Sequence, residues 1–313
     1  MKAVQYRAYG GSEVIEYVDV ERPVPGDGQV LLKVAGTSFN PVDAGIRGGY
    51  LSEVFAIDLP HIPGIDVAGT VTELGGGVEN WNVGDAVVAL LPMDADGAAA
   101  DYVVAPVEAL AAAPQSAHLA DAAALPTVGL TAWQAIFEIA GVTAGQTVLI
   151  NGAGGAVGGY ATQLAKKAGA VVTATAKPGD AERLRSRGAD HVIGYIDYTA
   201  TPLAVHGRPF DVVLNLIGTI PEETEALASV VADGGHYVGT MTSGPERPRR
   251  GIHAQRVFVR SDAAQLAGLV RRVDAGELHI DVAARRPLAD ASAVHETYDA
   301  GRLPGKTVLI PHA

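Results

Sequence analysis

The chain has 313 residues, a formal net charge of −12 at pH 7, many Ala, Val and Gly residues, and no cysteine. This length predicts two domains, and the acidic surface argues against nucleic acids and anionic membranes as partners. The lack of cysteine excludes disulfides, thiolate nucleophiles, iron–sulfur clusters and cysteine-ligated zinc. No apolar run has the length of a signal-peptide core or a membrane span, so we expect a soluble, cytoplasmic protein.

The first part of the chain is rich in short β-type runs. They lie at 30–34, 67–74, 86–91 and 101–104, and turn sequences such as PGDG, LGGG and NVGD separate them. Close turn spacing without helical periodicity predicts an antiparallel barrel. Two helical patterns follow, at 119–124 and 129–140.

Residues 147–176 have the pattern of a βαβ unit. A β-branched run enters the glycine cluster 152–159, and apolar residues then recur at helical spacing until a second apolar run begins. Glycines between a buried strand and a helix let the backbone approach a phosphate, which the free N–H groups of the helix bind. The motif reads Ala153-x-Gly155-x-x-Gly158, with alanine first, so a tight packing turn is the alternative to a dinucleotide site.

The end of the second strand of this unit bears on the choice of cofactor. An NAD site usually has Asp or Glu about 20 residues beyond the glycines, on the ribose 2′-hydroxyl. Here the strand ends Thr175-Ala176-Lys177, and a lysine attracts the 2′-phosphate that an acid would repel. We therefore predict NADPH, with an ordinary solvated lysine as the alternative. Asp180 is interpreted as the N-cap of the next helix.

Strands and helices continue to alternate after this unit. Helices are expected at 181–187, 222–231 and 262–274, and strands at 191–193, 211–215, 235–239 and 257–259. This order predicts a doubly wound parallel sheet with its ligand crevice at the carboxyl ends of the strands. The tail ends in the β-type run GKTVLIP, which we expect to rejoin the barrel. The expected domains are therefore 1–122 together with 276–313, and 123–275.

Seven segments in this order resemble the medium-chain dehydrogenase/reductase superfamily, and within it the zinc-free quinone oxidoreductases related to ζ-crystallin. They are NPVD (40–43), PGIDVAGTV (63–71), GDAV (84–87), AALPTVGLTAWQA (123–135), NGAGGAVG (151–158), ADHVIGY (189–195) and PGKTVL (304–309). The resemblance implies an α/β protein with a GroES-like β-barrel catalytic domain and a Rossmann domain. It also implies a cofactor in the cleft between these domains, and a homodimer.

The same resemblance implies a set of site residues. Tyr195 would lie near the adenosine phosphate, and Lys177 would bind the 2′-phosphate. The diphosphate turn would comprise Gly152, Ala153, Gly155, Ala156 and Val157, and the nicotinamide would lie beside Asn40, Thr131, Leu216, Ile217, Gly239 and Thr240.

Zinc is not expected. The zinc alcohol dehydrogenases of this superfamily have cysteine where this chain has Asn40 and histidine where it has Ile65, and an isoleucine cannot bind a metal. Without a metal, hydride can still pass to an acceptor that is electrophilic by itself, such as a quinone or an α,β-unsaturated carbonyl.

A proton donor near the acceptor oxygen would assist this reaction. Tyr50 is the first candidate, because related enoyl reductases have a catalytic tyrosine at the end of this loop, although the loop here is one residue shorter. The alternative is that Tyr50 is a rim aromatic. Asn40 could hydrogen-bond the substrate or the nicotinamide ribose, Asp43 is expected to hold the loop, and Arg47 is as readily a solvated residue as a functional one.

The leading hypothesis is therefore an NADPH-dependent reductase of quinones or enones. A zinc-free carbonyl or alcohol oxidoreductase remains an alternative. A non-catalytic, crystallin-like NADPH-binding protein is the alternative from a different functional class.

Overall fold

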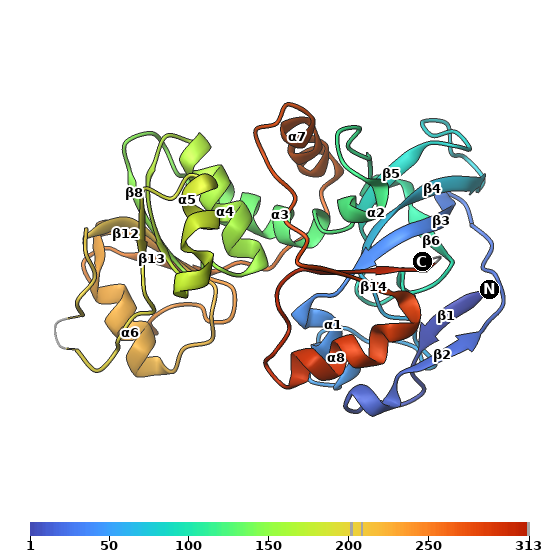
Figure 1. The fold of residues 1–313 in the computed structure, drawn as a ribbon, viewed down its shortest axis with the longest axis horizontal. Coiled ribbons are helices and arrows are strands. Elements are labelled where there is room, and N and C mark those ends of the chain that lie inside the picture. The colour runs from blue at the N-terminus through green and yellow to red at the C-terminus, as the bar shows by residue number, and fades with distance from the viewer. Residues whose placement is uncertain (201–202, 208, 312–313) are drawn as a thin grey trace. The chain divides into compact units, whose positions relative to one another are not determined.

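The computed structural model describes residues 1–200, 203–207 and 209–311. The chain forms two compact units (Figure 1). Unit 1 comprises Met1–Thr127 and Ser261–Ala313, and unit 2 comprises Val128–Arg260. The sequence predicts domain junctions after 122 and after 275, whereas helix α7 (Ala263–Asp274) belongs to unit 1 in the structure. Ser116 shows why: its N–H and Oγ both lie 2.9 Å from Asp274 Oδ1, which ties the end of α7 to unit 1.

Unit 1 is built on a seven-stranded sheet with the order β14-β15-β3-β4-β5-β7, and β6 pairs with β3 outside this order. The pairs are antiparallel except β14 with β15. The strands are β3 (Gln29–Ser38), β4 (Asp66–Leu74), β5 (Ala86–Leu90), β6 (Tyr102–Pro106), β7 (Leu110–Ala112), β14 (Ala284–Pro287) and β15 (Thr307–Ile310), and β1 (Lys2–Gln5) pairs with β2 (Glu16–Asp19) separately. The tail therefore rejoins the first sheet, as the sequence analysis predicted.

Alternating side chains make the core of this sheet. Val30, Leu32 and Val34 of β3 share one face and are buried together with Val67 and Val71 of β4. Leu31 and Ala68, on the opposite face, are buried as well, so both faces of this part of the sheet are covered. The helices are α1 (Pro41–Arg47), α2 (Leu119–Ala122), α7 and α8 (Ala291–Asp299), with short 3₁₀ helices η1 (Ser12–Val14), η2 (Val107–Ala109) and η5 (Leu288–Asp290).

Unit 2 contains a six-stranded parallel sheet with the order β10-β9-β8-β11-β12-β13. Its strands are β8 (Thr147–Asn151), β9 (Val171–Thr175), β10 (His191–Ile193), β11 (Phe210–Asn215), β12 (Val231–Gly239) and β13 (His253–Arg256). The chain runs outward from β8 to one edge and then from β11 to the other, so the strand order reverses between β8 and β11. Ligands of such sheets bind at the carboxyl ends of the strands at this switch point.

The helices of unit 2 follow the predicted alternation. They are α4 (Ala156–Lys167), α5 (Ala181–Ser186), α6 (Pro221–Ser229), the 3₁₀ helix η4 (Pro178–Asp180) and the π-helix η3 (Gln134–Ile139), with α3 (Pro126–Trp133) crossing the junction of the units. Helix α4 buries Tyr160, Ala161 and Leu164 on one face, and Lys166 and Lys167 lie in its last turn, where the helix dipole favours cations.

One predicted strand is wrong. The run 257–259 was expected to be a strand, but the last strand of the sheet is β13, four residues earlier, and 257–259 is irregular. Strand β13 pairs with β12 through its backbone, and its side chains alternate between exposed and half-buried. Its sequence HAQR therefore has no apolar signature. The apolar run VFV led to the prediction of a strand at 257–259, but Phe258 is largely exposed.

Candidate functional site

The glycine turn joins β8 to α4 and depends on glycine at particular positions. Gly152 has a φ of +89°, which L side chains rarely adopt. A Cβ on Gly158 would lie 2.5 Å from Ala153 Cα, so the first turn of α4 packs directly against the turn. Thr175, the last residue of β9, holds this turn by two hydrogen bonds. Its carbonyl accepts the Ala153 N–H at 3.1 Å, and its Oγ1 accepts the Gly152 N–H at 2.9 Å.

Other N–H groups of this turn have no hydrogen-bond partner among the described residues. Within the described part of the chain, no acceptor is found for the N–H groups of Gly154, Ala156 and Val157. Gly155 is the N-cap of α4 and brings no side chain to cap it. Free N–H groups at the positive end of a twelve-residue helix form an anion site. These residues therefore fit the diphosphate of a dinucleotide.

Lys177 and Tyr195 occupy equivalent places after neighbouring strands. Thr175 of β9 pairs with Ile193 of β10, and the two side chains each follow two residues later. Both are exposed, and no described residue bonds to the Lys177 ammonium. Asp180 and Arg183 are paired with each other, with Arg183 Nη2 3.2 Å from Asp180 Oδ1. Arg183 Nη2 also donates to the Gly154 carbonyl in the turn at 2.8 Å.

The residues expected around the nicotinamide lie on both units. Leu216 and Ile217 follow β11, and Thr240 follows β12, so these residues gather at the carboxyl edge of the sheet in unit 2. Gly239 must be glycine, since a Cβ there would lie 2.0 Å from the Thr242 carbonyl oxygen. Thr131 is buried in α3 of unit 2, whereas Asn40 belongs to unit 1.

A polar network under this edge was missed by the sequence analysis as a functional feature. Asn151 Nδ2 donates to Asn215 Oδ1 at 2.9 Å, and Asn215 Nδ2 donates to the Tyr237 hydroxyl at 2.9 Å. Thr175 Oγ1 donates to Asn151 Oδ1 at 3.0 Å. The available signal was that two apolar strands, VLIN and VVLN, each end in asparagine.

Asn40 lies in a second buried cluster, which joins three distant parts of unit 1. Its Oδ1 accepts from Lys306 Nζ at 2.6 Å, and its Nδ2 donates to Asp66 Oδ2 at 2.9 Å and to the Ser38 carbonyl at 3.2 Å. Lys306 also lies 3.1 Å from Asp66 Oδ2, and both side chains are buried. Asp66 and Lys306 were not predicted as site residues. The ammonium can only donate and the carboxylate accepts, so the orientation of the amide is fixed.

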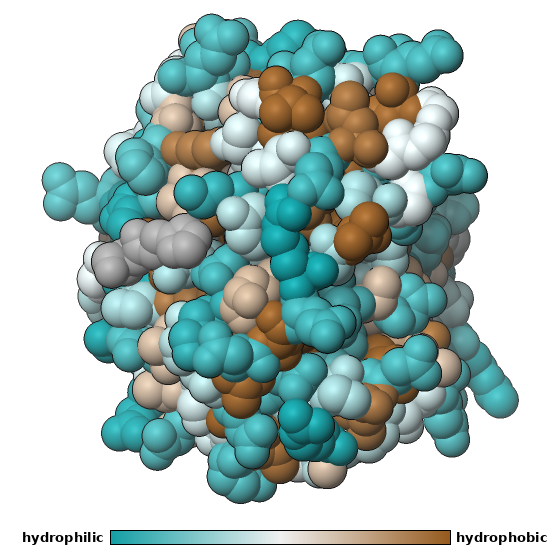
Figure 2. Space-filling model, turned by 90° about the vertical axis from the view of Figure 1, so that its right-hand side faces the viewer, coloured by the Kyte–Doolittle hydropathy of each residue, from teal (hydrophilic) through white to brown (hydrophobic). Residues whose placement is uncertain are grey.

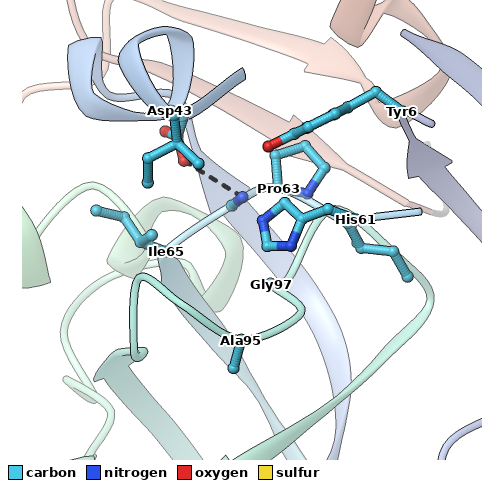
Figure 3. Close-up of a pocket in the computed structure, with 10 residues that line it drawn as sticks. Tyr6, Asp43, His61, Pro63, Ile65, Ala95 and Gly97 are labelled. Atoms are coloured by element: carbon cyan, nitrogen blue, oxygen red, sulfur yellow. Dashed lines mark hydrogen bonds between the residues drawn. The ribbon is translucent and has the colours of Figure 1, made fainter. Parts of the chain in front are cut away.

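Asp43 holds the loop, as expected. Its Oδ2 accepts the Asn40 N–H at 2.7 Å, and its Oδ1 accepts the Gly64 N–H at 3.3 Å. Burial raises the pKa of the Asp43 carboxyl to about 7. Next to it lies a cavity of about 10 Å³, the size that one water molecule fills. Figure 3 shows the Tyr6 hydroxyl directed toward the space between Asp43 and His61, and that hydroxyl has no partner among the described residues.

Tyr50 and Arg47 have contrasting environments. Tyr50 is 87% exposed, and the described residues provide no hydrogen-bond partner for its hydroxyl. The structure does not bring it into the cluster around Asn40. Arg47 is 4% exposed, which excludes a solvated role: it donates to the Gly10 carbonyl at 3.1 Å and contacts Asp299 and His295 at 2.8 Å each.

At the positions where the zinc relatives have their metal ligands, this chain has residues that do not fit a zinc site. Ile65 is apolar, both Nδ2 protons of Asn40 are used by Ser38 and Asp66 while its Oδ1 accepts from Lys306, and the adjacent carboxylate of Asp66 is paired with Lys306. Among the described residues, no group of three or more His, Asp or Glu side chains could hold a metal ion.

A parallel sheet in this order, with a glycine turn and free amides at its switch point, is typical of a dinucleotide-binding domain. Two family models match the chain, an alcohol dehydrogenase GroES-like domain over 26–115 and a zinc-binding dehydrogenase domain over 187–309. The chain belongs to the medium-chain dehydrogenase/reductase superfamily and is of the quinone oxidoreductase type.

Individual relatives agree with this assignment. The chloroplast envelope quinone oxidoreductase homolog of Arabidopsis thaliana is 41% identical over 228 residues, which is 71% of this chain and 69% of that protein. The 2-methylene-furan-3-one reductase of Solanum lycopersicum is 32% identical over 99% of this chain and 79% of its own length. The solved structure of mycobacterial Rv1454c complexed with NADPH has a TM-score of 0.85 and 28% identity, covering 99% of this chain and 100% of that one.

These findings make the chain an NAD(P)H-type oxidoreductase with a GroES-like and a Rossmann-type domain. No helix in the described ranges is long and apolar enough to span a membrane. Figure 2 shows one face of the molecule, on which hydrophilic residues surround separate groups of apolar ones.

Proposed function

We propose that this protein is an NADPH-dependent, zinc-independent oxidoreductase that delivers hydride to quinones or α,β-unsaturated carbonyls. The observation that carries this proposal is the buried cluster of Asn40, Asp66 and Lys306. At the place where zinc relatives bind their metal, this chain has an amide held by a lysine and a carboxylate already paired with that lysine. The acceptor must therefore be reactive without a metal.

Quinones and conjugated enones meet this requirement. Hydride adds to a carbon of the acceptor, and the resulting negative charge spreads to the conjugated oxygen. A bound reduced nicotinamide supplies the hydride, while the protein orients the reactants and excludes water. A plain ketone lacks this delocalisation and gains more from a Lewis acid.

Support for NADPH comes from the end of β9. The Lys177 ammonium is exposed and has no partner among the described residues, and Tyr195 follows the neighbouring strand at the same distance beyond the register pair. The nearby carboxylate of Asp180 is paired with Arg183, which reduces its repulsion of a 2′-phosphate.

Two residues of unit 1 are proposed to serve the reaction. Tyr50 is the proposed proton donor, because its hydroxyl is exposed and unengaged among the described residues. Asn40 is proposed to accept a hydrogen bond from the nicotinamide ribose or the substrate through the second lone pair of Oδ1. Both Nδ2 protons already bond to Ser38 and Asp66, so Asn40 does not donate.

One assay tests the proposal. Oxidation of NADPH and NADH is followed at 340 nm with a benzoquinone, a 2-enal, a saturated ketone and no acceptor, before and after treatment with a chelator. We expect NADPH consumption with the first two acceptors, unchanged by the chelator. Turnover with the saturated ketone alone would favour the carbonyl reductase. Tight NADPH binding without turnover would favour the non-catalytic binder, and stoichiometric zinc in active enzyme would refute metal independence.

Assembly and location are proposed from the family resemblance. We expect a homodimer, which sedimentation equilibrium would show at twice the mass of the 32.1 kDa chain. We expect cytoplasmic localisation, which fractionation of the native cells would test. The expected partner is a small-molecule acceptor of the hydride.

A further inference from the structure

Four neighbouring strands of unit 2 are linked by side-chain hydrogen bonds at their carboxyl ends. Thr175 of β9, Asn151 of β8, Asn215 of β11 and Tyr237 of β12 form one continuous chain, which we call the edge network. All four side chains are buried. The network crosses the switch point of the sheet, where the glycine turn begins.

Donor and acceptor roles run in one direction through the edge network. Thr175 Oγ1 accepts a hydrogen bond from the Gly152 N–H at 2.9 Å. The Thr175 hydroxyl donates its own hydrogen bond to Asn151 Oδ1 at 3.0 Å. The Asn151 amide then has both protons for Asn215 Oδ1 and the Tyr198 hydroxyl. Asn215 Nδ2 donates one hydrogen bond to the Tyr237 hydroxyl and one to the Thr219 hydroxyl. Each amide therefore uses both its donors and its oxygen, so neither can rotate without losing partners.

The edge network contacts a backbone N–H at one end and a side chain beyond β12 at the other. At one end it fixes the Gly152 N–H, and therefore the turn in which the N–H groups of Gly154, Ala156 and Val157 have no acceptor among the described residues. At the other end the Tyr237 hydroxyl lies 3.4 Å from Thr242 Oγ1, and the Asn215 carbonyl accepts the Thr240 N–H at 3.0 Å. All four side chains are uncharged, so no carboxylate of the network lies under the turn to repel a phosphate.

We propose that the edge network positions the glycine turn for the dinucleotide, with Thr175 as the positioning residue that transmits the orientation of the two asparagines to Gly152. This inference deepens the proposed function and rests on its dinucleotide-binding part. It concerns residues that would not touch the cofactor themselves. Loss of the network should therefore weaken cofactor binding without removing any direct contact.

The central test replaces Thr175 by valine. Thr175→Val keeps the shape and β-branching but removes the Oγ1 that accepts from Gly152 and donates to Asn151. Thr173→Val is the matched control, because Thr173 is in the same strand, is 2% exposed against 0% for Thr175, and makes no side-chain hydrogen bond in the described structure. Dissociation constants for NADPH and NADH are measured by nucleotide fluorescence, without any acceptor, and thermal midpoints are recorded in parallel.

We expect Thr175→Val to raise both dissociation constants about tenfold, and Thr173→Val to change them less than twofold. Amide hydrogen exchange gives a readout that general destabilisation would not move selectively. The Gly152 N–H should lose protection in Thr175→Val, while the amides in the middle of β8 keep theirs. Equal dissociation constants in the two variants, or an unchanged Gly152 exchange rate, would overturn the inference.

A second pair of variants protects the test against misfolding. Asn215→Asp is nearly isosteric but cannot donate to Tyr237, and it places a charge under the turn. Tyr198→Phe removes an acceptor 3.1 Å from Asn151 Nδ2 but keeps the bonds of Asn151 to Thr175 and Asn215. We expect Asn215→Asp to weaken cofactor binding at least tenfold and Tyr198→Phe to leave it within twofold. If the wild type itself bound neither nucleotide, the proposed function would fail; binding by the wild type that no network variant weakens would refute only the edge network.

Discussion

The buried contact between Arg47 and His295 makes a quantitative prediction about acid stability. Arg47 Nη1 lies 2.8 Å from His295 Nδ1, and an arginine can only donate, so Nδ1 must be the unprotonated acceptor. The ring of Phe39 packs edge-on against the imidazole at 4.8 Å. Burial, and then the charge of Arg47, lower the pKa of His295 from 6.5 to about 3.

The sign and size of the effect follow from this shift. Because the folded pKa lies below the unfolded one, the native state resists a proton that the unfolded chain accepts. Stability is therefore complete above pH 6.5 and is lost as the pH falls toward 3. Each pH unit in this window costs about 1.4 kcal/mol, so the loss between pH 6.5 and 5 is about 2 kcal/mol.

The assay compares urea unfolding at pH 7.5 and pH 5. His295→Asn keeps an acceptor near the Nδ1 position but does not titrate, so it should lose about 2 kcal/mol less than the wild type between these pH values. His118→Asn replaces an exposed histidine and should behave like the wild type. An identical pH dependence in His295→Asn and the wild type would refute the reasoning.

Four further predictions concern single side chains. Lys177→Ala should raise the KM for NADPH about tenfold and leave NADH unchanged, whereas Lys167→Ala should change neither; equal effects on both nucleotides would exclude a 2′-phosphate role. Tyr50→Phe should lower kcat for enones more than for quinones, which need less proton assistance, and intact rates with both would leave Tyr50 as a wall of the pocket. Burial raises the pKa of Asp43 from 3.8 to about 7, so its contribution to stability is complete below pH 3.8 and is lost as the pH rises through 7. Asp43→Asn does not titrate and should therefore reduce the stability loss between pH 5 and 8 by about 3 kcal/mol, measured by urea unfolding. Lys306→Met leaves a buried carboxylate unpaired and should cost about 3–5 kcal/mol by urea unfolding, and a cost below about 1 kcal/mol would contradict the buried pair.

Local patterns predicted much of the fold. The run from Thr147 to Asn151, the glycine turn and the periodic helix after it are signals within about 30 residues, and the structure has them in that order. Strand β13 was misplaced because an edge strand whose side chains alternate between exposed and half-buried needs no apolar residues.

The candidate site was less accessible to sequence reasoning, because its bonds join residues far apart in the chain. Lys306 lies 266 positions from Asn40 and 240 from Asp66, so no spacing rule connects them. The direction of the bonds through Asn151 and Asn215 likewise depends on the register of four strands. Arg47 was ambiguous in the sequence because only tertiary packing reveals that α8 covers it.

The contribution of strand β15 to unit 1 has a consequence for biosynthesis. During synthesis Asp66 leaves the ribosome long before its counter-ion, and all of unit 2 is translated between them. Until Lys306 arrives, burying that carboxylate is unfavourable, so the early segment should remain a loose and protease-sensitive intermediate while unit 2 can already fold. A nascent chain halted before residue 306 would then contain a folded unit 2 and an incomplete unit 1.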